Sequence, residues 1–61
     1  MQTTFLTTAE VAEALVLKRR TVQLKIRNKE LVAVNVGTLE RPSWRISQEE
    51  LDRYIAERTA A

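Results

Sequence analysis

The chain has 61 residues, the size of one small domain, and it contains no cysteine and no histidine. That composition excludes disulfide bonds, a Cys/His zinc site, a thiol nucleophile and an imidazole base. No apolar run approaches roughly 18 residues and the N-terminus lacks a signal-peptide pattern, so we expect a cytoplasmic protein without a membrane span. We expect neither a cofactor nor a metal ion, and no enzymatic activity.

The net charge is only +2, but the basic residues are concentrated in one segment. Residues 18–29 hold six Lys and Arg and no acidic residue, whereas the remainder holds four basic and eight acidic residues. A local basic patch attracts polyanions even when the mean charge is small. The segment therefore favours a polyanionic partner, and the alternative is a solvated helix face.

The first predicted helix covers residues 8–15. Thr7 and Glu10 have the spacing of a capping box, and Leu6 and Val11 have the spacing of a hydrophobic staple. The apolar positions that follow are expected to form one buried face; they are Val11, Ala12, Ala14 and Leu15.

A second helix is predicted to start at position 19 or 20, directly after a turn over residues 16–18. Val22 and Ile26 lie four residues apart and are expected to face the core together. Asn28-Lys29-Glu30 is expected to close this helix, and asparagine tolerates the left-handed conformation found at helix C-termini.

A β-hairpin and a third helix complete the predicted order. Residues 31–36 are β-branched and partly alternating, which predicts a strand. After a loop of about 6–7 residues, Trp44 and Ile46 are expected on the core side of an antiparallel return strand. Ser47 begins a second capping box and a helix over residues 48–58, whose expected inward residues are Leu51, Tyr54 and Ile55.

In this order the elements resemble the small winged helix-turn-helix domains of the excisionase and MerR-like superfamily. The resemblance covers about residues 5–56 and implies a single domain, residues 1–61, with an ordered core of about 5–58. The fold class is mostly α with a small β-hairpin. The segments that carry the resemblance are residues 6–15, Arg20-Thr21-Val22, Ile26-Arg27, Glu30-Leu31, Ala33-Val34, Val36-Gly37 and Trp44-Arg45-Ile46.

Three departures from the family pattern involve four positions. The family usually has Gly at the position of Val16 and a Ser or Thr cap at the position of Lys18. It also tends to have an apolar residue at the position of Lys25 and a polar one at Leu24. Either Lys25 runs its aliphatic stem along the edge of the core, or the helix is rotated and Leu24 belongs to the core.

The resemblance implies that the second helix enters the major groove of double-stranded DNA, while the wing follows the backbone or the minor groove. On this placement the base-reading residues are Arg20, Gln23 and, through thymine methyl groups, Leu24. Phosphate contacts are expected from Arg19, Thr21, Lys25 and Arg27. In the wing, Arg41 is expected in the minor groove and Arg45 at a phosphate. Trp44 is expected in the core, with base stacking as the alternative.

The leading functional hypothesis is an excisionase-like architectural protein of a bacterial or phage-infected cell. The resemblance implies that several copies bind side by side at an attachment site, bend the DNA and direct an integrase, a tyrosine or serine recombinase, toward excision. One alternative is a minimal transcriptional regulator of the MerR-like type. A second alternative is a winged-helix adaptor that binds proteins, which predicts weak salt dependence of binding.

Overall fold

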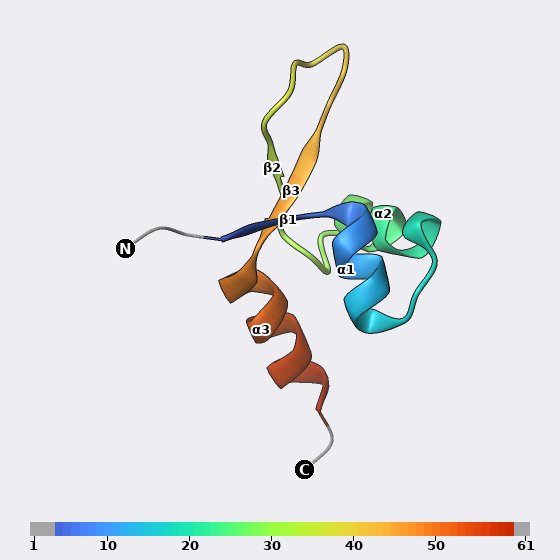
Figure 1. Cartoon of the computed structure of the whole chain (residues 1–61), viewed down its shortest axis with the longest axis vertical. Helices are drawn as coiled ribbons and strands as arrows, with labels where there is room; N and C mark the ends of the chain where they lie inside the picture. Colours follow the sequence, from blue (N-terminus) through green and yellow to red (C-terminus); the bar gives the residue numbers. More distant parts are fainter. Residues whose placement is uncertain (1–3, 60–61) are drawn as a thin grey trace.

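The computed structural model describes residues 4–59. Its elements are β1 (Phe5–Thr7), α1 (Thr8–Leu15), α2 (Arg19–Arg27), β2 (Val34–Asn35), β3 (Trp44–Ser47) and α3 (Gln48–Arg58). Figure 1 shows α1 and α2 together on one side of the sheet, the β2–β3 hairpin projecting at one end and α3 at the opposite end. This arrangement confirms the predicted winged helix-turn-helix. The expected domain bounds include positions 1–3 and 60–61, which lie outside the described residues.

The start of α1 is fixed by the predicted capping box. The Glu10 amide donates to the Thr7 hydroxyl over 3.1 Å, and the Thr7 amide donates to the Glu10 carboxylate over 3.0 Å. The Thr7 backbone and side chain hold the pKa of Glu10 below its ordinary value, with a smaller effect from the charge of Arg45. The helix ends at Val16, which takes the left-handed conformation (φ 56°) that the family usually gives to glycine.

The second helix begins without a side-chain cap at Lys18, as the sequence indicated. Its other end lies where predicted, since Arg27 is the last helical residue and Asn28 is the C-cap, but the left-handed residue is Lys29 (φ 63°) and not Asn28 (φ −83°). The amide of Glu30 donates to the carbonyl of Lys25 over 2.9 Å. That hydrogen bond joins the first and last of six residues. It forms only when the residue before Glu30, which is Lys29, takes the left-handed conformation.

The sheet has three strands, whereas the sequence predicted two. The strand order is β1-β3-β2, and both neighbours of β3 are antiparallel to it, with Leu6 opposite Ile46 and Val34 opposite Arg45. The predicted strand over residues 31–36 is reduced to two residues. One reason is that the Val32 amide donates to the carboxylate of Glu50 on α3, over 3.0 Å, and not to a neighbouring strand.

The third helix starts at Ser47, whose hydroxyl accepts from the Glu50 amide over 3.0 Å. The second half of the predicted capping box does not form, because the Glu50 carboxylate binds Arg53 and the amide of Val32 instead. Arg53 is the main cause of a lowered pKa at Glu50, and the Val32 amide contributes. Glu50 therefore joins α3 to the segment that follows α2.

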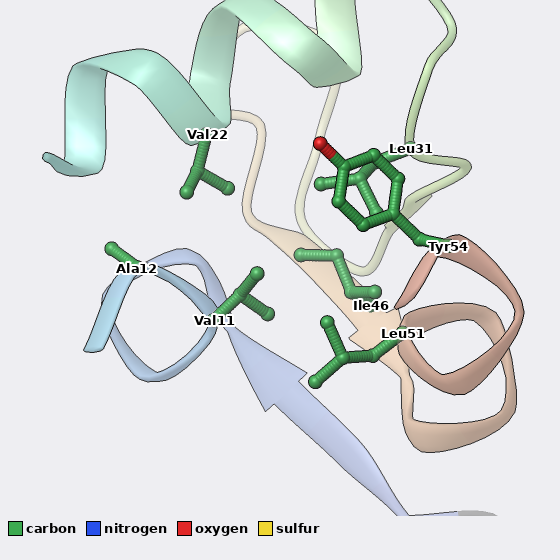
Figure 2. Packing of buried hydrophobic residues seen from close by; sticks show 7 residues of the cluster. All are labelled: Val11, Ala12, Val22, Leu31, Ile46, Leu51 and Tyr54. Atoms are coloured by element: carbon green, nitrogen blue, oxygen red, sulfur yellow. The ribbon is translucent and has the colours of Figure 1, made fainter. Parts of the chain in front are cut away.

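The core lies where the three helices meet the middle strand. Figure 2 shows its side chains converging from α1, α2, β3, α3 and the segment after α2. These buried residues are Val11, Ala12, Val22, Leu31, Ile46, Leu51 and Tyr54. Ile26, predicted to face inward, packs against this cluster while only partly buried.

Three residues predicted to face the core are exposed. Ala14 lies off the helical stripe that Val11 shares with Leu15, and it faces solvent. Ile55 is 43% exposed on a side of α3 that no other described element covers. Trp44 is 38% exposed, because it lies at the wing end of β3, beyond the buried Ile46.

Candidate nucleic-acid interface

One face of α2 brings the predicted base-reading residues together. Positions 20, 23, 24 and 27 repeat with the spacing of a single helical stripe, and Val22 holds the opposite side in the core. The same four residues line one shallow depression of about 230 Å³; they are Arg20, Gln23, Leu24 and Arg27. Leu24 is 45% exposed, so it belongs to this surface and not to the core.

The other predicted phosphate contacts of α2 lie at different places around the helix. Arg19 is exposed in its first turn, and Thr21 is half-buried beside the stripe. Lys25 points away from the stripe, toward α3: its ammonium lies 4.0 Å from the Glu30 carboxylate and 5.6 Å from the centre of the Tyr54 ring. Its side chain is only 21% exposed. Of the two interpretations of the inverted Leu24–Lys25 pair, the structure supports a packed lysine stem.

The Asn35 side chain makes three hydrogen bonds that order the loop of the wing. The Asn35 carboxamide oxygen accepts from the amides of Gly37 and Ser43, each over 2.9 Å, and its nitrogen donates to the carbonyl of Thr38 over 3.2 Å. A Cβ on Gly37 would lie 2.3 Å from the Arg41 carbonyl oxygen, so the loop also needs a glycine at this position. The eight residues between β2 and β3 therefore form an ordered loop.

Arg41 and Leu39 lie at the tip of the wing. The Arg41 amide donates to the Thr38 hydroxyl over 2.9 Å, and its carbonyl accepts from the Thr38 amide over 3.1 Å, which fixes the backbone of the tip. The Arg41 side chain is exposed beside an exposed Glu40. Leu39 is 98% exposed, the highest value among the large apolar residues described. The tip thus presents one cation, one carboxylate and one apolar side chain to solvent.

The Arg45 side chain is more buried than that of Arg41, and its guanidinium is hydrogen-bonded within the protein. Its guanidinium donates to the Ser43 hydroxyl over 2.9 Å and to the Trp44 carbonyl over 3.0 Å, and the residue is half-buried on the middle strand. Its charge also acts on Glu10 at the start of α1. Arg45 therefore joins the base of the wing to the sheet, with part of its guanidinium left for a ligand.

A groove separates α2 from the base of the wing. It has a volume of about 670 Å³, and its lining contains two cations, an indole and no acidic residue. The lining residues are Gln23, Ile26, Arg27, Lys29, Pro42 and Trp44. Sequence reasoning gave Lys29 no DNA contact, and it gave Trp44 one only as the alternative to a place in the core. The charge of the 18–29 segment was a signal for Lys29, whereas the half-exposed state of Trp44 depends on tertiary structure.

Among residues 4–59 no cluster of carboxylate side chains is arranged to hold a metal ion. None of the described helices is long and apolar enough to cross a membrane.

Residues 5–59 match the family model described as a helix-turn-helix domain. The chain belongs to this family. The helix-turn-helix domain indicates DNA binding, and proteins of this family are typically non-enzymatic. The family includes excisionase-like DNA-binding proteins, which supports the resemblance drawn from the sequence. No curated protein and no solved structure matches the chain.

Proposed function

We propose that this helix-turn-helix protein is a sequence-specific, excisionase-like architectural protein that binds duplex DNA with α2 in the major groove and the wing in the adjacent minor groove. The observation that carries the proposal is the exposed α2 stripe, which has two arginines, an amide and no acidic residue, and which lies beside the basic groove. Side chains of this kind on a second helix are what read base edges in other helix-turn-helix proteins.

The chemistry of the stripe suggests a role for each residue. Arg20 suits guanine O6 and N7, Gln23 suits adenine N6 and N7, and Leu24 suits a thymine methyl group. Phosphates are assigned to residues at the margins of the stripe, namely Arg19, Thr21 and Arg27. Lys25 is left out, because its ammonium faces Glu30 and Tyr54.

The wing suggests how the protein bends DNA. An arginine at a loop tip suits the negative potential of a narrow minor groove, which is the role proposed for Arg41. Apolar side chains that enter a minor groove unstack a base step and kink the duplex by roughly 20–90°. Leu39 is the apolar side chain in the right place for this, because it is 98% exposed on a fixed tip.

Size and charge support the proposal that several copies bind cooperatively. A single module of this kind buries only ~600–1,000 Å² on DNA, which limits the affinity of one copy. The molecule measures 41 × 31 × 19 Å, comparable to one duplex turn of ~34–36 Å, so copies one turn apart would meet. The α3 segment has four acidic and two basic residues and can face the basic α2 region of a neighbour. The DNA assembled in this way would direct an integrase, a tyrosine or serine recombinase, toward excision.

A mobility-shift titration on the DNA flanking the gene, with a salt series, tests the proposal. We expect a ladder of cooperative complexes whose affinity falls steeply with salt. Arg20→Ala and Arg41→Ala are each expected to weaken the complexes, whereas Lys25→Gln, a loss of charge at a cation that faces Glu30 and Tyr54, is not. One discrete complex over a promoter would favour a regulator. No complex at low salt would refute DNA binding and favour a protein partner.

The bend is measured separately by energy transfer between dyes at the two ends of the site. Leu39→Ala is expected to reduce the bend while the salt slope stays unchanged, because no phosphate contact is lost. Leu39→Met, which keeps a long apolar side chain, is the matched control and should retain the bend. An unchanged bend in Leu39→Ala would refute the wedge and leave the rest of the proposal standing.

A further inference from the structure

The groove between α2 and the wing lies where a DNA strand has to pass. In a duplex, one sugar-phosphate strand separates each major groove from the next minor groove. If α2 occupies the major groove and the wing the minor groove, that strand runs between them. The 670 Å³ groove lies at this position, since α2 supplies one wall and Pro42 and Trp44 supply the other. This step rests on the proposed mode of DNA binding.

The charge of the groove matches a phosphate strand. Arg27 is exposed on α2, and Lys29 follows in the left-handed position that ends the helix. None of the groove-lining residues is acidic. Neither cation makes an ion pair with another described residue, in contrast to Lys25 and Arg58, which pair with Glu30, and to Arg53, which pairs with Glu50 and Glu57. Two unpaired cations in an open groove are suited to neighbouring phosphates of one strand.

The floor of the groove suits the apolar part of the same strand. Trp44 is 38% exposed and lines both this groove and a second depression of about 300 Å³ that Ile26 and Lys29 share with it. An indole offers an apolar face with one polar N–H edge, the combination that a deoxyribose next to a phosphate can use. Burying a half-exposed Trp face under a sugar removes apolar surface from water, which favours binding.

From these observations we infer that the groove is a clamp for one sugar-phosphate strand, in which Lys29 and Arg27 bind successive phosphates and Trp44 packs against the intervening deoxyribose. Lys29 and Trp44 are positioning residues in this scheme. They set the register of α2 and of the wing on the duplex and read no base. The clamp also gives a role to Trp44, which is 38% exposed and lines the groove instead of lying in the core.

The single tryptophan makes the clamp measurable in the intact protein. Titration with duplex DNA is expected to change the Trp44 emission and to lower its quenching by acrylamide, because the strand covers the indole. Lys29→Gln is expected to reduce the slope of log K against log salt by about 0.9, one phosphate contact, which is roughly eightfold in affinity at 0.1 M salt. Lys25→Gln, the same substitution at a lysine whose ammonium faces Glu30 and Tyr54, should keep the wild-type slope.

A duplex series with one neutral methylphosphonate at each position locates the contact. At one position the modification should weaken wild-type binding and have no further effect on Lys29→Gln, because the two changes remove the same interaction. Circular dichroism of the variant verifies that it is folded. Additive effects at every position would overturn the clamp.

The remaining outcomes separate the clamp from the proposed function. If the wild type binds duplex DNA while Trp44 stays as quenchable as in the free protein and Lys29→Gln keeps its slope, the clamp is refuted and DNA binding stands. If single-stranded DNA changes the Trp44 emission and protects it from acrylamide as strongly as duplex DNA does, the clamp is refuted and base stacking on Trp44 is favoured. If no duplex is bound at low salt, both proposals are refuted.

Discussion

At residue scale, Val16 combines a left-handed backbone conformation with a side chain that is not packed against the core. Its φ of 56° is in the left-handed region, where a β-branched residue is a genuine outlier. The cost of such a conformation is roughly 1–3 kcal/mol. The side chain is 89% exposed, so packing does not offset this cost. The turn between α1 and α2 therefore stores strain that glycine would relieve.

Val16→Gly is expected to raise the free energy of unfolding by about 1 kcal/mol, because the relief of strain exceeds the added flexibility of the unfolded chain, ~0.5–1 kcal/mol. Urea denaturation followed by circular dichroism measures the change. Val16→Ala removes the β-branch and keeps the Cβ, so its gain should be smaller. A destabilised Val16→Gly would show that the turn is not strained.

Glu50 gives the stability a dependence on pH. Its carboxylate accepts from the Val32 amide and pairs with Arg53, which together hold its pKa below the ordinary 4.5. A lowered pKa in the folded state means that the ionised carboxylate stabilises the fold above pH 4.5. That contribution is lost as the pH falls through the lowered pKa.

Glu50→Gln is therefore expected to cost about 1.5 kcal/mol at pH 7, the lower end for hydrogen bonds to a charged group. The difference from the wild type should shrink as the pH falls below 4.5. Urea unfolding at a series of pH values measures it, and Glu10, whose pKa is also lowered, contributes equally to both proteins. A difference that stays constant down to pH 3 would contradict the assigned cause.

At element scale, the wing depends on polar contacts more than on apolar packing. Asn35 makes three hydrogen bonds to its loop, and the apolar residues of the hairpin are mostly exposed. Asn35→Ala is thus expected to loosen the wing and leave the three helices folded. Hydrogen exchange of the Gly37 and Ser43 amides should accelerate more than that of the Val22 amide. Equal acceleration would mean that the wing and the helices unfold together.

The helices could be predicted from the sequence because their signals are local. The Thr7–Glu10 box and the Ser47 cap fix where α1 and α3 start, and both predicted ranges are confirmed. The strand β1 could not be found in this way. Phe5-Leu6-Thr7 is too short to show a period, and it forms a strand only because β3 has a free edge to pair with. Strand pairing over such a distance leaves no local pattern.

The candidate site was predictable in part for the same reason. The helical repeat brings Arg20, Gln23 and Arg27 to one face whatever the rest of the fold does. The orientation of Lys25 depends on Glu30 and Tyr54, which only the folded chain brings beside it. The exposure of Trp44 depends on where the core ends along β3. The roles of these residues in DNA binding remain predictions.

At the scale of the whole molecule, the core is small enough for one residue to decide stability. Ile46 is fully buried at the junction of the sheet and the helices, as Figure 2 shows. A domain of this size is stable by ~3–9 kcal/mol, at roughly 0.05–0.15 kcal/mol per residue. Truncating a buried isoleucine to alanine costs ~2–5 kcal/mol.

Ile46→Ala is therefore expected to leave much of the protein unfolded at 37 °C, as measured by thermal melting in circular dichroism. Ile55→Ala is the control, because the same side chain is 43% exposed there and should cost under about 1 kcal/mol. Similar losses for the two variants would contradict the assigned core.

The position of β1 also sets the order in which the protein can form during synthesis. Its partner β3 is made about 40 residues later, so the first described strand can pair only after the last described strand has been made. At ~5–20 residues per second that wait is about 2–8 seconds. Until then the apolar residues of α1 and α2 lack the strand and the helix that cover them. A nascent chain that stops before Trp44 consequently has both helices of the DNA-binding unit and no folded domain to hold them.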